Sequence, residues 1–198
     1  MTGKIKLPHA SGNSVSIAAP QSNPASDRTL YVPSNADGTI LTNTTPGTII
    51  QSVQGNYTAN VTSSNTSAHE EISSDLRATI TPISATSKLI ITYNLLLHIS
   101  TTSVITVRIL KDGSSTVVEN AQGSYSSNLQ RGNSTHYSDS DLFGNRIVQV
   151  IDTAGSTAQR YYTPFWYMPA GTRGINGYIN HTSTHAGTSS YSVMEVAQ

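Results

Sequence analysis

Short runs of β-branched and aromatic residues, broken at brief intervals by Gly, Asn, Asp or Pro, fill most of this 198-residue chain. Val, Ile, Thr and Tyr favour the pleated surface of strands, and closely spaced turn residues between short strands are typical of a sandwich or barrel. Only residues 68–78 have a helix-like composition, and we interpret them as a loop or a short turn of helix. The pattern therefore predicts an all-β protein.

The longer strands are predicted after residue 47. Residues 88–98 are nearly all apolar, as expected of a central strand covered on both faces. Residues 104–111 run into Asp112-Gly113, a pair that suits a turn with positive φ, and predict a hairpin with residues 116–119. Other strands are expected at 48–54, 76–82, 145–152, 159–168, 173–181 and 190–196. Eight or nine antiparallel strands in two sheets predict a jelly-roll-like β-sandwich.

One predicted strand has an alternative. Asn176-Gly177 could form a turn, but Ile175, Gly177 and Ile179 keep the alternation of a strand, which favours a continuous strand through this point.

The pattern changes near Pro46-Gly47. Residues 1–46 hold five of the eight prolines, and their apolar residues come as thin pairs. Such a segment buries too little apolar area to offset its chain entropy. We therefore predict an extended arm of short strands over residues 1–46, which folds on its own copies or on a partner, followed by a sandwich domain over residues 47–198. The candidate docking residues of the arm are Ile5, Leu7, Val15, Ile17, Leu30 and Val32.

Composition excludes several classes of function. Eleven basic residues balance eleven acidic ones, so the chain has no electrostatic attraction to nucleic acid. No run of 18 apolar residues exists, so membrane insertion is not expected. The absence of Cys excludes disulfides and thiolate chemistry. Residues 1–20 lack the apolar core of a signal peptide, so we expect the protein to stay in the cytosol of the cell that makes it or to leave that cell by a route other than secretion.

No pattern singles out a reaction, a cofactor or a metal. The chain has no nucleophile elbow, phosphate loop or dinucleotide fingerprint, and we predict that it is not an enzyme. Asp139 and Asp141 could offer oxygen ligands to Ca²⁺, but no EF-hand loop with a closing Glu follows. His181 and His185 have helical spacing, but their flanking residues are those of a loop or strand, so we assign them no metal.

The densest aromatic cluster of the chain comprises Tyr161, Tyr162, Phe165, Trp166 and Tyr167. Alternation along a strand places Tyr161, Phe165 and Tyr167 on one face and Tyr162 and Trp166 on the other. Bulky residues on both faces indicate that both are covered, one by the core and the other by the facing sheet or a neighbouring subunit. The alternative is a platform on which saccharide rings stack.

Two parts of the sequence resemble phage virion proteins. The first is the run KIKLPHASGNSVSI at residues 4–17, continued by Ser22-Asn23-Pro24 and by residues 27–33 and 37–42. It resembles a short module of tail-fibre and other virion proteins of marine phages, cyanophages especially. The second resembles the terminal β-domain of phage fibre-type proteins, in residues 80–82, 86–91, 107–113, 151–157, 177–180 and 193–196.

The resemblance implies a structural protein of the virion surface, assembled in the host cytoplasm and usually homotrimeric. Its N-terminal segment would attach to other virion proteins of the capsid or tail. One arm module without a long shaft implies a short tail fibre or a capsid-decorating fibre, with host surface glycans as a further expected contact. The alternatives are a monomeric carbohydrate-binding module with a cleft near the aromatic strand, and a small glycan-depolymerising tailspike, which needs two facing carboxylates.

Overall fold

The computed structural model describes residues 4–8, 10–12, 14–18, 45–113, 118, 134–138, 142–177 and 187–198. Apart from one turn of 3-10 helix, η1 (Ser74–Leu76), their regular structure is all strand, which confirms the all-β prediction. The chain divides into two compact units, residues 1–40 and residues 41–198. Within these described ranges, no helix is long and apolar enough to cross a membrane.

The first unit contains an antiparallel hairpin of β1 (Lys4–Pro8) and β2 (Ser14–Ala18). Ile5 lies opposite Ile17 and Leu7 lies opposite Val15 in the register, and the side chains of Ile5, Leu7 and Ile17 share one face. Both strands coincide with apolar pairs of the predicted arm. Leu30 and Val32, the other two candidate docking residues, lie outside the described residues.

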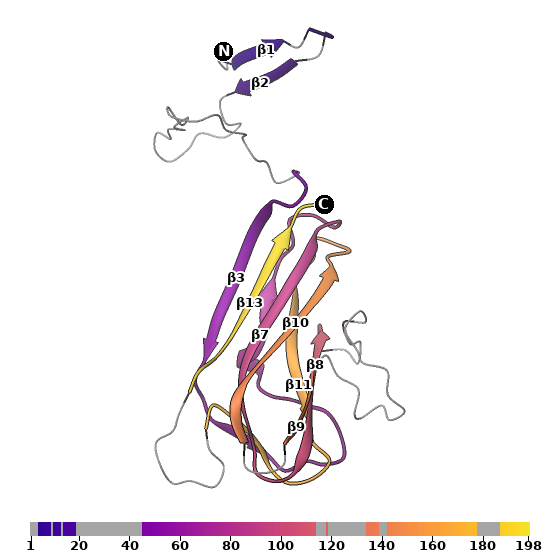
Figure 1. Cartoon of the computed structure of the whole chain (residues 1–198). Helices are drawn as coiled ribbons and strands as arrows, with labels where there is room; N and C mark the ends of the chain where they lie inside the picture. The colour runs from indigo at the N-terminus through magenta and orange to yellow at the C-terminus, as the bar shows by residue number, and fades with distance from the viewer. Residues whose placement is uncertain are drawn as a thin grey trace. The chain divides into compact units, whose positions relative to one another are not determined.

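The second unit is a sandwich of two antiparallel sheets (Figure 1). The first sheet has the order β3–β13–β7–β10, in which β7 is central. Two short strands extend this sheet beyond the end of β13: β12 pairs with the far end of β7, and β4 pairs with β12. The bounds are β3 (Ile49–Tyr57), β4 (Val61–Ser63), β7 (Lys88–Ile99), β10 (Leu142–Thr153), β12 (Arg173–Ile175) and β13 (Ser189–Val196).

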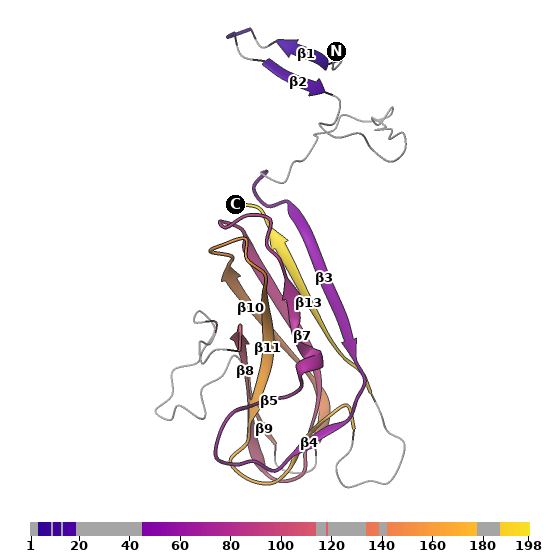
Figure 2. The ribbon, with the colours of Figure 1, turned by 180° about the vertical axis from the view of Figure 1, so that it is seen from behind.

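The second sheet lies behind the first in the view of Figure 1 and in front in Figure 2. The short strands β5 and β6 pair with one edge of β11, β8 pairs with the other edge, and β9 pairs with β8. The bounds are β5 (Glu70–Glu71), β6 (Ala78–Ile80), β8 (Ser103–Lys111), β9 (Ser134–Ser138) and β11 (Arg160–Tyr167).

The strand order is that of a jelly roll. We number the strands of the sandwich from one to eight in chain order and count each of the pairs β3/β4, β5/β6 and β12/β13 as one interrupted strand. The first sheet then reads 1-8-3-6 and the second 2-7-4-5. This arrangement of eight strands in two sheets confirms the jelly-roll-like sandwich that the strand count predicted.

The core lies between the two sheets. Leu89, Ile91, Tyr93 and Leu95 of β7 point inward and are buried, and the Tyr93 hydroxyl donates across the core to the carbonyl of Tyr162 (2.7 Å). The outward residues of β7 from Lys88 to Leu96 are only half-buried, so the prediction that both faces are covered is wrong. An antiparallel sheet in a sandwich buries one face on the core and can leave the other in water.

The predicted turn at Asp112-Gly113 and the predicted strand through Asn176 have different outcomes. Asp112 (φ 54°) and Gly113 (φ 63°) form the expected left-handed turn. Of its predicted partner strand only Val118 is described, and the Val118 N–H donates to the Ile109 carbonyl (3.2 Å). The predicted continuous strand through Asn176 is wrong, because β12 ends at Ile175 and Asn176 is left-handed (φ 62°).

The side chain of Asn176 explains this break. Its amide donates to the carbonyls of Tyr57 (2.7 Å) and Ala59 (3.1 Å) and accepts from the Ser189 hydroxyl (2.7 Å). Asparagine tolerates the left-handed conformation, and its side chain here bonds residues distant in the chain, at the end of β3 and the start of β13.

Candidate functional site

The aromatic strand β11 packs its bulkiest residues into the fold. Tyr162 and Trp166 point into the core and are buried, and the Trp166 indole N–H donates to the Glu70 carboxylate (3.1 Å). On the opposite face Tyr167 is also buried, while Tyr161 and Phe165 are half-buried. The only Trp of the chain therefore offers no open ring face on which a saccharide could stack.

Charged groups beside this strand pair with one another. The buried Arg173 guanidinium donates to the Glu70 carboxylate (2.6 Å) and lies 5.2 Å from the centre of the Trp166 ring. Burial alone would raise the pKa of Glu70, but bonds from Ser63 and Asn65 and the nearby Arg173 hold that pKa below its ordinary value. This cluster fixes β5 against β11 and β12.

His69 is neutral at physiological pH. Burial, and then the positive charges of Arg108 and Arg173, lower its pKa to about 4. Its ring lies 5.2 Å from the ring of Tyr167. The side chain is therefore packed against the aromatic strand as an uncharged group.

The N-terminal hairpin exposes an apolar face. The side chains of Ile5, Leu7 and Ile17 are 63%, 53% and 53% exposed, and the strand register places them on the same face. A two-stranded hairpin is marginally stable by itself in water, so this face is a candidate docking surface.

A second candidate surface is the outer face of the first sheet. Gln54, Ser192, Thr92 and Gln149 lie side by side across the four strands, and the next row begins with Asn56, Ser190 and Asn94. Their side chains alternate with inward residues such as Val53, Val193 and Ile91. Over β3, β13 and β7 these two rows are a grid of neutral amides and hydroxyls, whereas β10 ends the second row with Ile147, which is 70% exposed.

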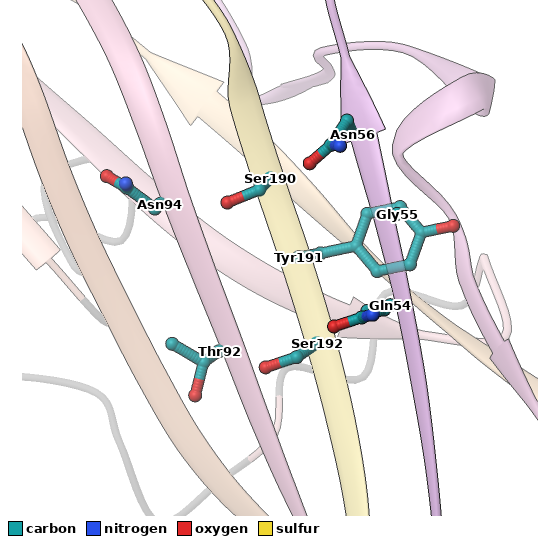
Figure 3. A pocket seen from close by; sticks show the side chains of 8 residues that line it. All are labelled: Gln54, Gly55, Asn56, Thr92, Asn94, Ser190, Tyr191 and Ser192. Carbon is teal, nitrogen blue, oxygen red and sulfur yellow. The ribbon is translucent and has the colours of Figure 1, made fainter.

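This grid contains a hollow of about 550 Å³ (Figure 3). Figure 3 shows that its walls come from three neighbouring strands, β3, β13 and β7. Its lining has no Asp, Glu, Lys, Arg or His, and comprises Gln54, Gly55, Asn56, Thr92, Asn94, Ser190, Tyr191 and Ser192. The side-chain oxygen of Asn94 is shielded from solvent and has no hydrogen-bond partner among the described residues. We name this feature the amide hollow.

Sequence reasoning missed the amide hollow. Its signal in the sequence is the recurrence of polar residues at every second position in 52–56, 92–94 and 190–192. These polar residues have neither the rings nor the charges that mark the other candidate sites. Among the described residues no group of three His, Cys, Asp or Glu could hold a metal ion. Asp139, Asp141, His181 and His185 lie outside the described residues.

Comparison with known proteins identifies no family for this chain. No family model matches the sequence, and no curated protein matches it. Weak structural similarity exists to the VP2 subviral particle of infectious bursal disease virus, with 12% identity and a TM-score of 0.31 over 94% of this chain. The Gx and Gt strains of the same virus give 11% and 12% identity, TM-scores of 0.27 and 0.26, and 93% and 94% coverage. The chain spans about half the length of these proteins, 47–48%.

The resemblance of the sequence to phage fibre-type proteins is not tested by these structural likenesses and stays a prediction.

Proposed function

We propose that the protein is a structural component of a phage virion. In this proposal the N-terminal unit, residues 1–40, anchors the chain to other virion proteins, and the jelly-roll unit is displayed on the particle surface. The observation that carries the proposal is the apolar face of the hairpin, where Ile5, Leu7 and Ile17 are more than half exposed. The jelly-roll order supports it, because this architecture is common in viral capsid and lectin domains.

The resemblance of residues 4–17 to a virion module favours the same role and narrows it to a short tail fibre or a capsid-decorating fibre. A homotrimer is the assembly that we propose. Closed cyclic symmetry is the usual arrangement of homo-oligomers, and the choice of three copies follows from the fibre resemblance. Three hairpins around an axis would bury the apolar face that one hairpin exposes.

Anchoring is tested by co-sedimentation with phage particles that lack the protein. The intact chain should sediment with the particles, and a chain with Ile5, Leu7 and Ile17 all changed to Ser should stay in the supernatant. Lys6→Ser is the matched control, because Lys6 lies on the same strand with its side chain on the opposite face. Binding of the triple variant at the level of the intact chain would refute the anchor.

The trimer is tested separately by sedimentation equilibrium of the intact chain. A species near three times 21.1 kDa is expected, and a species near one chain mass would refute the trimer.

A further inference from the structure

We propose that the amide hollow binds a neutral saccharide. The inference goes beyond the virion role and does not depend on it, since it concerns the outer face of the jelly roll alone. It also differs from a platform on the aromatic strand, because Trp166 and Tyr162 are buried in the core.

The lining has the hydrogen-bonding chemistry that saccharide hydroxyls need. Each Asn and Gln amide offers donors and an acceptor, and each Ser and Thr hydroxyl offers both. Neighbouring strands place such groups about 4.8 Å apart, and alternate residues along one strand place them about 6.7 Å apart. A saccharide laid along one row of this grid would meet Asn56, Ser190 and Asn94 from three different strands.

The absence of charge in the lining selects among saccharides. No Lys, Arg or His lines the amide hollow, so a carboxylate or sulfate on a sugar would lose water there without gaining a cation. A neutral hydroxyl exchanges its bonds to water for bonds to amides at little net cost. The hollow therefore favours neutral over anionic saccharides.

Asn94 is the residue with unused bonding capacity. Its side-chain oxygen has no partner among the described residues, and in Figure 3 the oxygen lies on the side of the amide away from Ser190. The terminal torsion of asparagine is broad, so a half-turn of the amide would bring the oxygen to the hollow. In that orientation the oxygen could accept from a sugar hydroxyl, and the –NH2 group would take the shielded position that the oxygen now occupies.

The binding should be weak for one copy. The side chain of Tyr191 packs toward Tyr93 on the core side, with ring centres 5.9 Å apart, so no aromatic face is available for stacking in the hollow. Hydrogen bonds that replace bonds to water give modest affinity, and we expect a dissociation constant on the order of 1 mM. Several copies on one particle would raise the avidity.

The test is a titration of the ¹⁵N-labelled intact chain, followed by amide chemical shifts. The probes are maltotriose, cellotriose and triacetylchitotriose as neutral saccharides, with trigalacturonate as the anionic comparison, each up to 20 mM. We expect saturable shifts at the backbone amides of Asn56, Asn94 and Ser190 with at least one neutral probe, and weaker shifts with trigalacturonate. No shifts with any probe, or shifts confined to other residues, would overturn the proposal.

Variants separate binding from folding. Asn94→Ala should weaken binding of the same probe about fivefold, the loss expected for one hydrogen bond. Asn145→Ala is the matched control, since Asn145 is an exposed amide on β10 of the same sheet but outside the hollow. Ser192→Arg keeps the core intact and should block the hollow. Equal affinity of all three variants would overturn the site, whatever the outcome of the particle-binding test.

Discussion

The ring of Tyr191 lies across Gly55 on the neighbouring strand, in the space that a side chain at residue 55 would occupy (Figure 3). A Cβ at Gly55 would approach the tyrosine ring to 2.6 Å. The ring also packs toward Tyr93, so it has little room to move aside. An aromatic side chain that covers a glycine on an adjacent strand stabilises a position that glycine alone would weaken.

We therefore expect Gly55→Ala to destabilise the jelly roll by about 1–3 kcal/mol, the usual cost of overpacking. Urea denaturation of the variant and the parent chain measures this difference. Gly144→Ala is the control, because the nearest atom to a Cβ there is a side-chain nitrogen of Arg146 at 3.6 Å, an ordinary contact. Equal stability of the two variants would contradict the account.

Strands with alternating apolar residues could be predicted from the sequence because each has a full buried face. Val148 and Val150 of β10 and Leu89 to Leu95 of β7 are examples. Strands β4, β5 and β9 were missed because they are short and polar, and their pairing depends on the neighbouring strand rather than on their own pattern. Glu70 and Glu71, for instance, form a strand opposite Trp166 and Phe165 while their side chains bind Arg173 and Arg77.

Glu195 provides a test of pH dependence. This buried carboxylate accepts from the N–H groups of Ile83 and Ser84 (3.0 Å each) and from the Gln51 amide (2.5 Å). Burial alone would raise its pKa, but these bonds outweigh burial and hold the pKa below its ordinary value near 4.5. The ionised form therefore contributes stability that is present above pH 4.5 and is lost as the pH falls through the folded-state pKa.

Glu195→Gln should cost about 2 kcal/mol at pH 7, because hydrogen bonds to a charged group are lost. The difference from the parent chain should shrink as the pH falls below 4.5. Denaturant titrations at pH 7 and at pH 3 measure both values, with Asp75→Asn as the control at an exposed acid. A difference that is the same at both pH values would rule out the carboxylate as the cause.

The Arg173–Glu70 pair should be strongly coupled. Arg173→Met leaves the Glu70 carboxylate without its buried cation, and we expect a loss of about 3 kcal/mol. The double variant with Glu70→Met should recover part of that loss, because neither charge is then left alone. Arg77→Met, which removes the more exposed ion pair with Glu71, should cost much less than Arg173→Met, because solvent screens that pair. A double-mutant cycle with no coupling energy would show that the pair is independent.

At Asn176 two contributions can be separated. Asn176→Gly removes the side-chain hydrogen bonds but keeps the left-handed backbone accessible, whereas Asn176→Ala removes the bonds and adds a conformational cost of about 1 kcal/mol. Thermal unfolding should rank the parent chain above the Gly variant and the Gly variant above the Ala variant. At Asp112, the other left-handed residue, Gly should again be tolerated better than Ala. The reverse order at both positions would contradict the backbone argument.

The candidate surfaces were predictable to different degrees. Ile5, Leu7 and Ile17 were identified because exposed apolar pairs in a polar segment are visible in the sequence alone. The amide hollow was not, since it requires the register that places Asn56, Ser190 and Asn94 in one row on three strands distant in the chain. No local pattern contains that register.

The junction at Asn176 has a practical consequence. The Gly187 N–H donates to the Asn176 carbonyl (3.0 Å), and the Asn176 N–H donates to the Leu96 carbonyl (2.9 Å), so the sheet is closed by the residues on either side of 178–186. A peptide spliced between these two ends would leave from positions that backbone hydrogen bonds hold. Foreign peptides, such as epitopes or affinity tags, could therefore be carried at this position, and the jelly roll would serve as a display scaffold.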